Sequence, residues 1–151
     1  MIHRRTLLGV LLSVTAPSLA AAQGAQTAIL YKNPQCQCCD AYADVLQRSG
    51  IAVTVKETPA LAALKREHGV PEPLQGCHTL LIDGYVVEGH VPAEDVERLL
   101  RECPAVAGLA APGMPTGSPG MEVPGAPADR YDVVAFGRDG AARVYASHGP
   151  R

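Results

Sequence analysis

Three cysteines fall within four residues of the segment 33-NPQCQCCD-40. Cys36 and Cys39 form a C-x-x-C pair, and Cys38 lies between them. At the start of a helix, the positive end of the helix dipole favours thiolates, which act as nucleophiles or as metal ligands. For the pair alone, an inert disulfide is the alternative. Cys38 favours metal, because a free thiol beside a redox pair would exchange with its disulfide, whereas a soft-metal site can use a third sulfur.

Five other residues carry donor atoms of the same kind. A cysteine and a histidine are adjacent at Cys77-His78, and the remaining candidates are His90, Met114 and Met121. A lone histidine such as His90 is often a surface or core residue, and methionine usually fills gaps in a core. Both methionines, however, lie in a Pro/Gly-rich segment, which favours a ligand role over core packing.

The donor types in this set indicate which metal it would bind. Thiolate, imidazole and thioether are soft or borderline ligands, and without carboxylates they disfavour Mg, Ca and Mn. Zinc accepts cysteine and histidine but gains little from thioether, whereas thiolate with thioether selects Cu(I). More sulfur atoms are present than one tetrahedral ion needs, which is compatible with bridging thiolates and several ions per chain. The predicted copper ligands are Cys36, Cys38, Cys39, Cys77, His78, His90, Met114 and Met121.

Residues 1–22 predict a cleaved export signal. Arg4 and Arg5 precede an apolar run that ends in Ala20-Ala21-Ala22, a pattern typical of secretory signals and too short for a membrane anchor. The paired arginines suggest the twin-arginine route, and the Sec route is the alternative. Either route leads to a bacterial periplasm or exterior, where disulfides can form. The five cysteines all lie beyond the signal, and Cys103, which has no evident companion, is interpreted as an incidental thiol.

Hydrophobic periodicity predicts alternating strands and helices in the rest of the chain. Asp83-Gly84 is a strong signal for a two-residue hairpin turn. Extended runs rich in β-branched residues predict strands at 27–31, at 51–57 and on both sides of that turn within 77–90. Helical spacing predicts helices at 40–48, followed by Gly50, and at 59–69, which begins with proline and ends in glycine. A third helix is predicted at 92–103, which begins with proline and has acidic residues in its first turn. A final hairpin is expected at 131–136 and 141–147.

The first part of this order is β-α-β-α-β-β-α, with the C-x-x-C pair in the loop between the first strand and the first helix. That order and that placement predict an α/β, thioredoxin-like core. In thioredoxin-like proteins the turn before the third strand is usually X-Pro-Thr and packs against the C-x-x-C pair. Cys77-His78-Thr79 stands in that place, so we expect Cys77 and His78 to face the Cys36–Cys39 loop. The alternative is a buried cysteine and a surface histidine.

Residues 104–130 are rich in proline and glycine, which argues against a helix or a central strand there. We interpret this segment as an ordered loop folded back over the domain, and a flexible linker is the alternative. The predicted division is a thioredoxin-like metal or redox domain at 23–103, with the loop and hairpin of 104–151 packed on the same domain. A length of 151 residues suits one modest domain, and a net charge of −2 without a Lys/Arg run argues against nucleic acid.

Four segments together resemble the CopG-type proteins of bacterial copper-resistance loci. They are 33-NPQCQCCD-40, 76-GCHT-79, 87-VEGHVPAED-95 and 112-PGMPTGSPGMEVPG-125. The resemblance extends from about Thr27 to the last hairpin. It implies a periplasmic, thioredoxin-like protein that binds copper through clustered Cys, His and Met residues and has a redox role in copper handling. Two residues depart from the pattern: Gln37 stands where a small residue is expected, and Cys103 where no cysteine is expected.

Two functions remain open from the sequence. The first is a periplasmic copper-binding protein of copper resistance or homeostasis, which holds Cu(I), takes part in redox chemistry and works with other periplasmic copper-resistance proteins. The second is a thiol–disulfide oxidoreductase in which Cys36 attacks and Cys39 resolves. A purely structural disulfide domain is disfavoured, because adjacent Cys38 and Cys39 cannot easily pair with each other. Neither function involves nucleic acid or a membrane anchor after signal cleavage.

Overall fold

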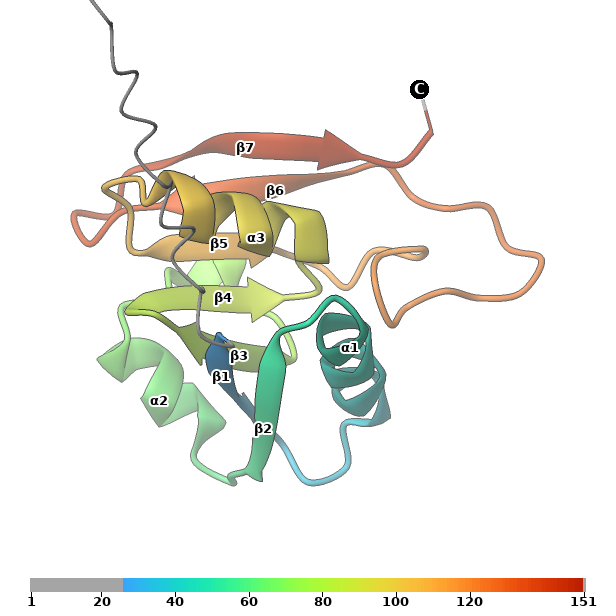
Figure 1. The fold of residues 1–151 in the computed structure, drawn as a ribbon, viewed down its shortest axis with the longest axis horizontal. Helices are drawn as coiled ribbons and strands as arrows, with labels where there is room; N and C mark the ends of the chain where they lie inside the picture. The colour runs from blue at the N-terminus through green and yellow to red at the C-terminus, as the bar shows by residue number, and fades with distance from the viewer. Residues whose placement is uncertain (1–25, 151) are drawn as a thin grey trace, which may run out of the picture.

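The computed structural model describes residues 26–150, which build a mixed α/β fold around one sheet (Figure 1). The predicted export signal lies outside the described residues. In chain order the elements are β1 (Thr27–Lys32), α1 (Gln37–Arg48), β2 (Ala52–Glu57), α2 (Leu61–Glu67), the short 3-10 helix η1 (Glu72–Leu74), β3 (His78–Ile82), β4 (Tyr85–Gly89), α3 (Ala93–Glu102), β5 (Gly108–Ala111), β6 (Tyr131–Phe136) and β7 (Ala142–His148).

Within residues 26–150, seven strands form a sheet in the order β2-β1-β3-β4-β5-β6-β7. Strands β1 and β2 run parallel and are joined through α1, whereas β1 pairs antiparallel with β3, and β3 with β4. The α/β prediction is therefore confirmed, and the arrangement of the first four strands is consistent with a thioredoxin-like fold. None of the helices in this part of the chain is both long and apolar enough to cross a membrane.

Two local predictions were wrong. The Pro/Gly-rich segment 104–130 was expected to hold no central strand, yet β5 lies between β4 and β6. The four residues of β5 contain no proline and are all buried, and Gly108 is required because a Cβ there would collide with the Val86 carbonyl oxygen. The prediction was based on the average composition of the segment, in which this short apolar run carries little weight.

The second error concerns the start of the first helix, which was expected at Asp40. Helix α1 begins at Gln37, with Cys36 as its N-cap residue. The amide of Cys36 donates to the Asn33 carbonyl at 3.1 Å, a turn that leads the chain directly into the helix. Cys38 and Cys39 are therefore helical residues, and their side chains follow the geometry of the first turn of α1.

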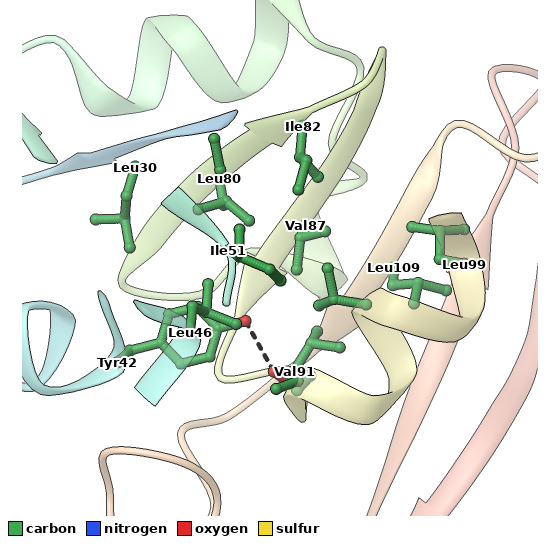
Figure 2. Close-up of a cluster of buried hydrophobic side chains, with 14 of the residues drawn as sticks. Leu30, Tyr42, Leu46, Ile51, Leu80, Ile82, Val87, Val91, Leu99 and Leu109 are labelled. Atoms are coloured by element: carbon green, nitrogen blue, oxygen red, sulfur yellow. Dashed lines mark hydrogen bonds between the residues drawn. The ribbon is translucent and has the colours of Figure 1, made fainter. Parts of the chain in front are cut away.

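The main hydrophobic core lies between the sheet and helices α1 and α3 (Figure 2). Its largest fully buried members include Tyr42, Leu46, Leu80, Leu99 and Leu109. Burial of one such leucine stabilises a fold by about 1.5–3 kcal/mol, so α1 is firmly attached along its length. Firm attachment of α1 fixes the position of the cysteines at its N-terminus.

Alternation along β3 and β4 divides their side chains between two faces of the sheet. Leu80 and Val87 belong to the core under α1 and α3. Thr79 and Glu88, directly paired across the two strands, instead contact Lys65 of α2 on the opposite face. His78 lies on the α1 face, where its ring contacts the ring of Tyr42.

Candidate metal centre

The C-x-C-C segment presents three sulfur atoms at the N-terminus of α1. Cys36 and Cys39 are joined by a disulfide in this structure, and Cys38 is a free thiol. The Sγ atoms of Cys36 and Cys38 are 3.4 Å apart. All three sulfurs therefore lie together, but Cys36 and Cys39 can act as thiolate ligands only after the disulfide is reduced.

A buried lysine holds this segment to the end of β1. The Lys32 ammonium donates to the Cys36 carbonyl at 3.2 Å and to the Asp40 carboxylate at 2.7 Å. Lys32 is only 4% exposed, whereas the Asp40 side chain is more than half exposed. These contacts place a positive charge beside the cysteine-bearing turn and connect it to the sheet.

Cys77 stands at the centre of the cluster. Its Sγ atom is 3.8 Å from that of Cys38 and 3.7 Å from that of Cys39. The same atom is 3.3 Å from His78 Nδ1 and 3.1 Å from His90 Nε2. Cys77 thus belongs both to a four-cysteine group with Cys36, Cys38 and Cys39 and to a second group with the two histidines, and the donor atoms in each group lie within 4.8 Å of one another.

The chain fixes which nitrogen of His90 is available. Nδ1 of this ring lies 2.8 Å from the Pro119 carbonyl oxygen, which can only accept, so Nδ1 carries the proton. Nε2 then presents its lone pair toward the Cys77 sulfur. A ring oriented by a backbone carbonyl through one nitrogen is the usual arrangement of a metal-binding histidine.

His78 is wholly buried and incompletely satisfied. Its Nε2 atom has no hydrogen-bond partner among the described residues. Burial, then the neighbouring His90 and Lys65, hold the pKa of His78 well below its ordinary value. Burial also lowers the pKa of His90. Both imidazoles are therefore neutral at pH 7, the form that binds a metal, and the His78 nitrogen that faces the Cys77 sulfur is Nδ1.

The environment of Cys77 keeps its thiol protonated when no metal is bound. Burial, followed by the nearby Cys38, raises the pKa of Cys77 to about 12. Because a metal binds the thiolate, occupation of this position would displace the proton. The sulfur is thus a weak nucleophile by itself but a suitable ligand.

Tyr42 was not anticipated from the sequence. Its ring centroid is 4.6 Å from that of His78 and 5.4 Å from that of His90, and its hydroxyl donates to the Val91 carbonyl at 2.7 Å (Figure 2). Its place one helical turn after Cys39 is the only signal that the sequence contains. The phenol packs against both imidazoles and restricts their rotation.

The Pro/Gly-rich loop lies against the centre through Pro119 and Gly120. Besides the Pro119 contact with His90, a Cβ at Gly120 would be 2.8 Å from the Tyr42 amide nitrogen, so the loop touches α1 directly. Met114 is 47% exposed and Met121 is partly buried. No contact described within residues 26–150 joins either methionine sulfur to the cysteines and histidines, so their role as ligands stays a prediction.

Cys103 differs from the other four cysteines in its position and its exposure. It is exposed, caps the C-terminus of α3 in a left-handed conformation, and donates from its thiol to the Leu100 carbonyl at 3.1 Å. It belongs to neither of the two donor groups found in the described residues. This thiol therefore provides a matched control for substitutions in the cluster.

The fold and site together define a mixed α/β protein with a partly buried cysteine–histidine centre whose donor atoms suit a soft metal. A family model described as "Protein of unknown function, DUF411" matches residues 74–121. No curated protein matches the chain. Among solved structures, "Copper resistance protein copG- Form 2" is 41% identical with a TM-score of 0.77, and covers 82% of this chain and 98% of its own. "Copper resistance protein copG- Form 1" is 40% identical with the same TM-score and coverage.

The chain belongs to the CopG family of copper-resistance proteins. The resemblance inferred from the four sequence segments is thereby confirmed. A copper-related function follows from this membership together with the clustered cysteines and histidines.

Proposed function

We propose that this protein binds Cu(I) as an exported component of bacterial copper resistance or homeostasis. The observation that carries the proposal is the position of Cys77, whose sulfur lies within 3.8 Å of donor atoms from Cys38, Cys39, His78 and His90. Thiolate and neutral imidazole are ligands that Cu(I) accepts, and no carboxylate belongs to either donor group. The copper would be held chiefly by Cys36, Cys38, Cys39, Cys77, His78 and His90.

The shared position of Cys77 supports more than one copper ion per chain. A thiolate can bridge two metal ions, and Cys77 is the one residue common to the two donor groups found in residues 26–150. Met114 and Met121, from the adjacent loop, are the proposed additional thioether ligands. Full occupation requires reduction of the Cys36–Cys39 disulfide, which consumes two electrons and two protons and yields two thiols.

The proposed location is the bacterial periplasm. Residues 1–22 have the basic start, apolar run and small-residue end of an export signal. A compartment that permits disulfides also suits a chain in which Cys36 and Cys39 are joined. The proposed partners are copper ions and other periplasmic copper-resistance proteins.

The Cys36–Cys39 disulfide supports a second candidate function, thiol–disulfide exchange. In that reaction an incoming thiolate attacks one sulfur of the bond, a mixed disulfide forms and the other sulfur leaves as a thiolate. Cys36, partly exposed at the helix N-cap, is the accessible sulfur, and buried Cys39 is the resolving one. A redox step coupled to copper would use the same pair.

An anaerobic Cu(I) titration of the reduced protein against a competing chelator tests the proposal. We expect tight binding of one or more ions, with a lower copper count and weaker binding in Cys77→Ser, because this variant removes the sulfur common to both groups. Cys103→Ser should bind as the wild type does. Wild-type binding no tighter than that of a simple dithiol would contradict the proposal.

Cys38→Ser separates the two candidate functions. If copper binding is the function, the loss of this sulfur weakens the affinity for Cu(I). If disulfide exchange is the function, the variant retains its exchange rate with a small dithiol, because Cys36 and Cys39 are untouched. An unchanged copper affinity together with rapid exchange would favour the oxidoreductase.

A further inference from the structure

A buried charged network lies behind the metal centre, on the opposite face of the sheet. Glu88 of β4 is 0% exposed, and Lys65 of α2 is 4% exposed. Their side chains form an ion pair in which the ammonium donates to Glu88 Oε1. Neither residue belongs to a donor group of the centre.

The Glu88 carboxylate binds both ends of the turn that carries Cys77 and His78. Glu88 Oε1 accepts from the Gly76 amide at 2.7 Å, and Oε2 accepts from the Thr79 hydroxyl at 2.7 Å. The two metal-binding candidates are the residues between these anchor points. One carboxylate therefore fixes the turn on both sides of the pair.

Lys65 reinforces the same turn. Its ammonium donates to the Thr79 hydroxyl at 3.0 Å and to the His78 carbonyl at 3.4 Å. Strand alternation sends the His78 ring to the α1 face while its backbone and the neighbouring Thr79 side chain are held from the α2 face. The network thus acts on the backbone of the turn without contacting a donor atom.

Gly76 allows this close approach. A Cβ at this position would lie 2.9 Å from the Gly89 Cα atom, a distance that side chains do not tolerate. The turn therefore packs directly on the end of β4, immediately before His90. Glu88 is joined through Gly89 to one ligand-bearing segment and through the Gly76 amide to the other.

We propose that Glu88 is a positioning residue of the metal centre, which sets the separation between Cys77, His78 and His90 through its hydrogen bonds to the 76–79 turn. This role rests on the proposed function, since it concerns the same copper ligands. A buried ion pair by itself contributes little stability compared with well-packed apolar residues. Outer partners that orient metal ligands, in contrast, commonly change metal affinity about 10–100-fold when they are lost.

Two double variants isolate the hydrogen bonds from the charges. Lys65→Met/Glu88→Gln and Lys65→Met/Glu88→Leu both remove the buried ion pair. The introduced glutamine has an amide oxygen that can accept from the Gly76 amide and an NH₂ group that can donate to the Thr79 hydroxyl. Leucine of similar volume can do neither. Comparison of the two variants therefore measures the hydrogen bonds to the turn.

The readouts are Cu(I) affinity and the copper X-ray absorption spectrum. We expect the glutamine variant to keep the wild-type nitrogen and sulfur coordination. The leucine variant should bind Cu(I) about 10–100-fold more weakly, with loss of the histidine nitrogen contribution to the spectrum. Equal affinities and identical spectra in the two variants would overturn the positioning role, because a purely structural network has no reason to change the ligand set.

Amide hydrogen exchange of the metal-free protein keeps the inference separate from the proposed function. The Gly76 amide should exchange slowly in the wild type and in the glutamine variant, and quickly in the leucine variant. If the wild type binds no Cu(I), the proposed function fails, yet unequal Gly76 exchange would still support the action of Glu88 on the turn and equal exchange would refute it. If the leucine variant does not fold, Thr79→Val with Thr79→Ser as its control tests the Glu88–Thr79 hydrogen bond by the same readouts of Cu(I) affinity and copper spectrum, since only serine keeps the hydroxyl. Equal results for these two variants would then overturn the positioning role.

Discussion

Two buried histidines face each other at the candidate centre, with ring centroids 4.9 Å apart. Burial holds the pKa of His78 and that of His90 below the ordinary value of 6.5. As the pH falls through this value, the two histidines become protonated in the unfolded chain while they remain neutral in the folded chain. The stability contributed by the neutral rings is therefore present above about pH 6.5 and is lost as the pH falls.

We expect the free energy of unfolding of the metal-free protein to decrease below pH 6.5 by up to about 1.4 kcal/mol per pH unit for each buried ring. Urea unfolding between pH 7.5 and pH 5 measures this slope. His90→Gln should reduce the slope, because it removes one of the two buried rings whose pKa is lowered. A wild-type slope that does not change on removal of His90 would show that other groups dominate acid unfolding.

At the residue scale, the sequence predicts the candidate metal-ligating residues better than the residues that hold them in position. Cys36, Cys38, Cys39, Cys77 and His78 could be selected because their atoms are soft ligands and their spacing is unusual. Tyr42 and Glu88 could not, since a tyrosine in a helix and a glutamate in a strand have many ordinary roles. Their effect on the centre depends on three-dimensional contacts with the His78 ring and with the turn that carries Cys77, which are distant from them in sequence.

The loop from Pro112 to Gly125 is the element whose contact with the centre is most easily tested. Gly120 has a φ of +81°, and a Cβ there would lie 2.8 Å from the Tyr42 amide nitrogen. Gly113 has a φ of +84°, and a Cβ there would meet nothing within 4 Å. The two glycines therefore share backbone strain on substitution but differ in contact with α1.

We expect Gly113→Ala to destabilise the protein by about 1–2 kcal/mol through left-handed strain alone. Gly120→Ala should destabilise it more and should also weaken Cu(I) binding, because displacement of the loop moves the Pro119 carbonyl away from His90. Urea unfolding and chelator competition measure the two effects. Equal copper affinity in both variants would indicate that the loop does not influence the centre.

Element prediction succeeded where local signals agreed with packing. The hairpin at Asp83-Gly84 and the proline-started helix α3 have strong turn and capping signals, and both are present. Strand β5 lacked such a signal, because four small or apolar residues between Pro/Gly-rich neighbours have no periodicity to detect. Its pairing with β4 and β6 is a tertiary effect.

At the scale of the whole molecule, the centre joins segments that are distant along the chain. Its donors come from the N-terminus of α1, the start of β3 and the connection between β4 and α3, and the loop before β6 orients one of them. Metal bound by such residues connects these segments only in the folded state. Copper loading should therefore stabilise the whole fold.

A free Cu(I) concentration 100 times the dissociation constant should stabilise the reduced protein by about 2.7 kcal/mol, by mass action at one site. Thermal unfolding with and without buffered Cu(I) measures the shift. The increase in unfolding temperature should be smaller in Cys77→Ser than in the wild type, and the same as in the wild type in Cys103→Ser. An unfolding temperature that is independent of copper would mean that the metal binds the folded and unfolded chains equally.

The sequence was sufficient to predict the α/β class, because the strands and the helices of the β-α-β unit have different hydrophobic patterns that can be recognised separately. It could not indicate that the sheet continues from β4 through β5 into the final hairpin. That continuation depends on Gly108, which allows β5 to pack against Val86 and Phe136. The sequence alone does not show which residues a single glycine will contact. The division of the chain at residue 103 stays a prediction.

The hydrogen bond between His90 and the Pro119 carbonyl has an evolutionary consequence. Every amino acid supplies a main-chain carbonyl, so the acceptor would persist through any substitution at position 119 that preserves the path of the loop. A substitution at position 119 would therefore leave the proton on Nδ1 of His90. Searches for functional positions by residue type would overlook position 119, while an insertion or deletion in the loop would move the carbonyl away from His90.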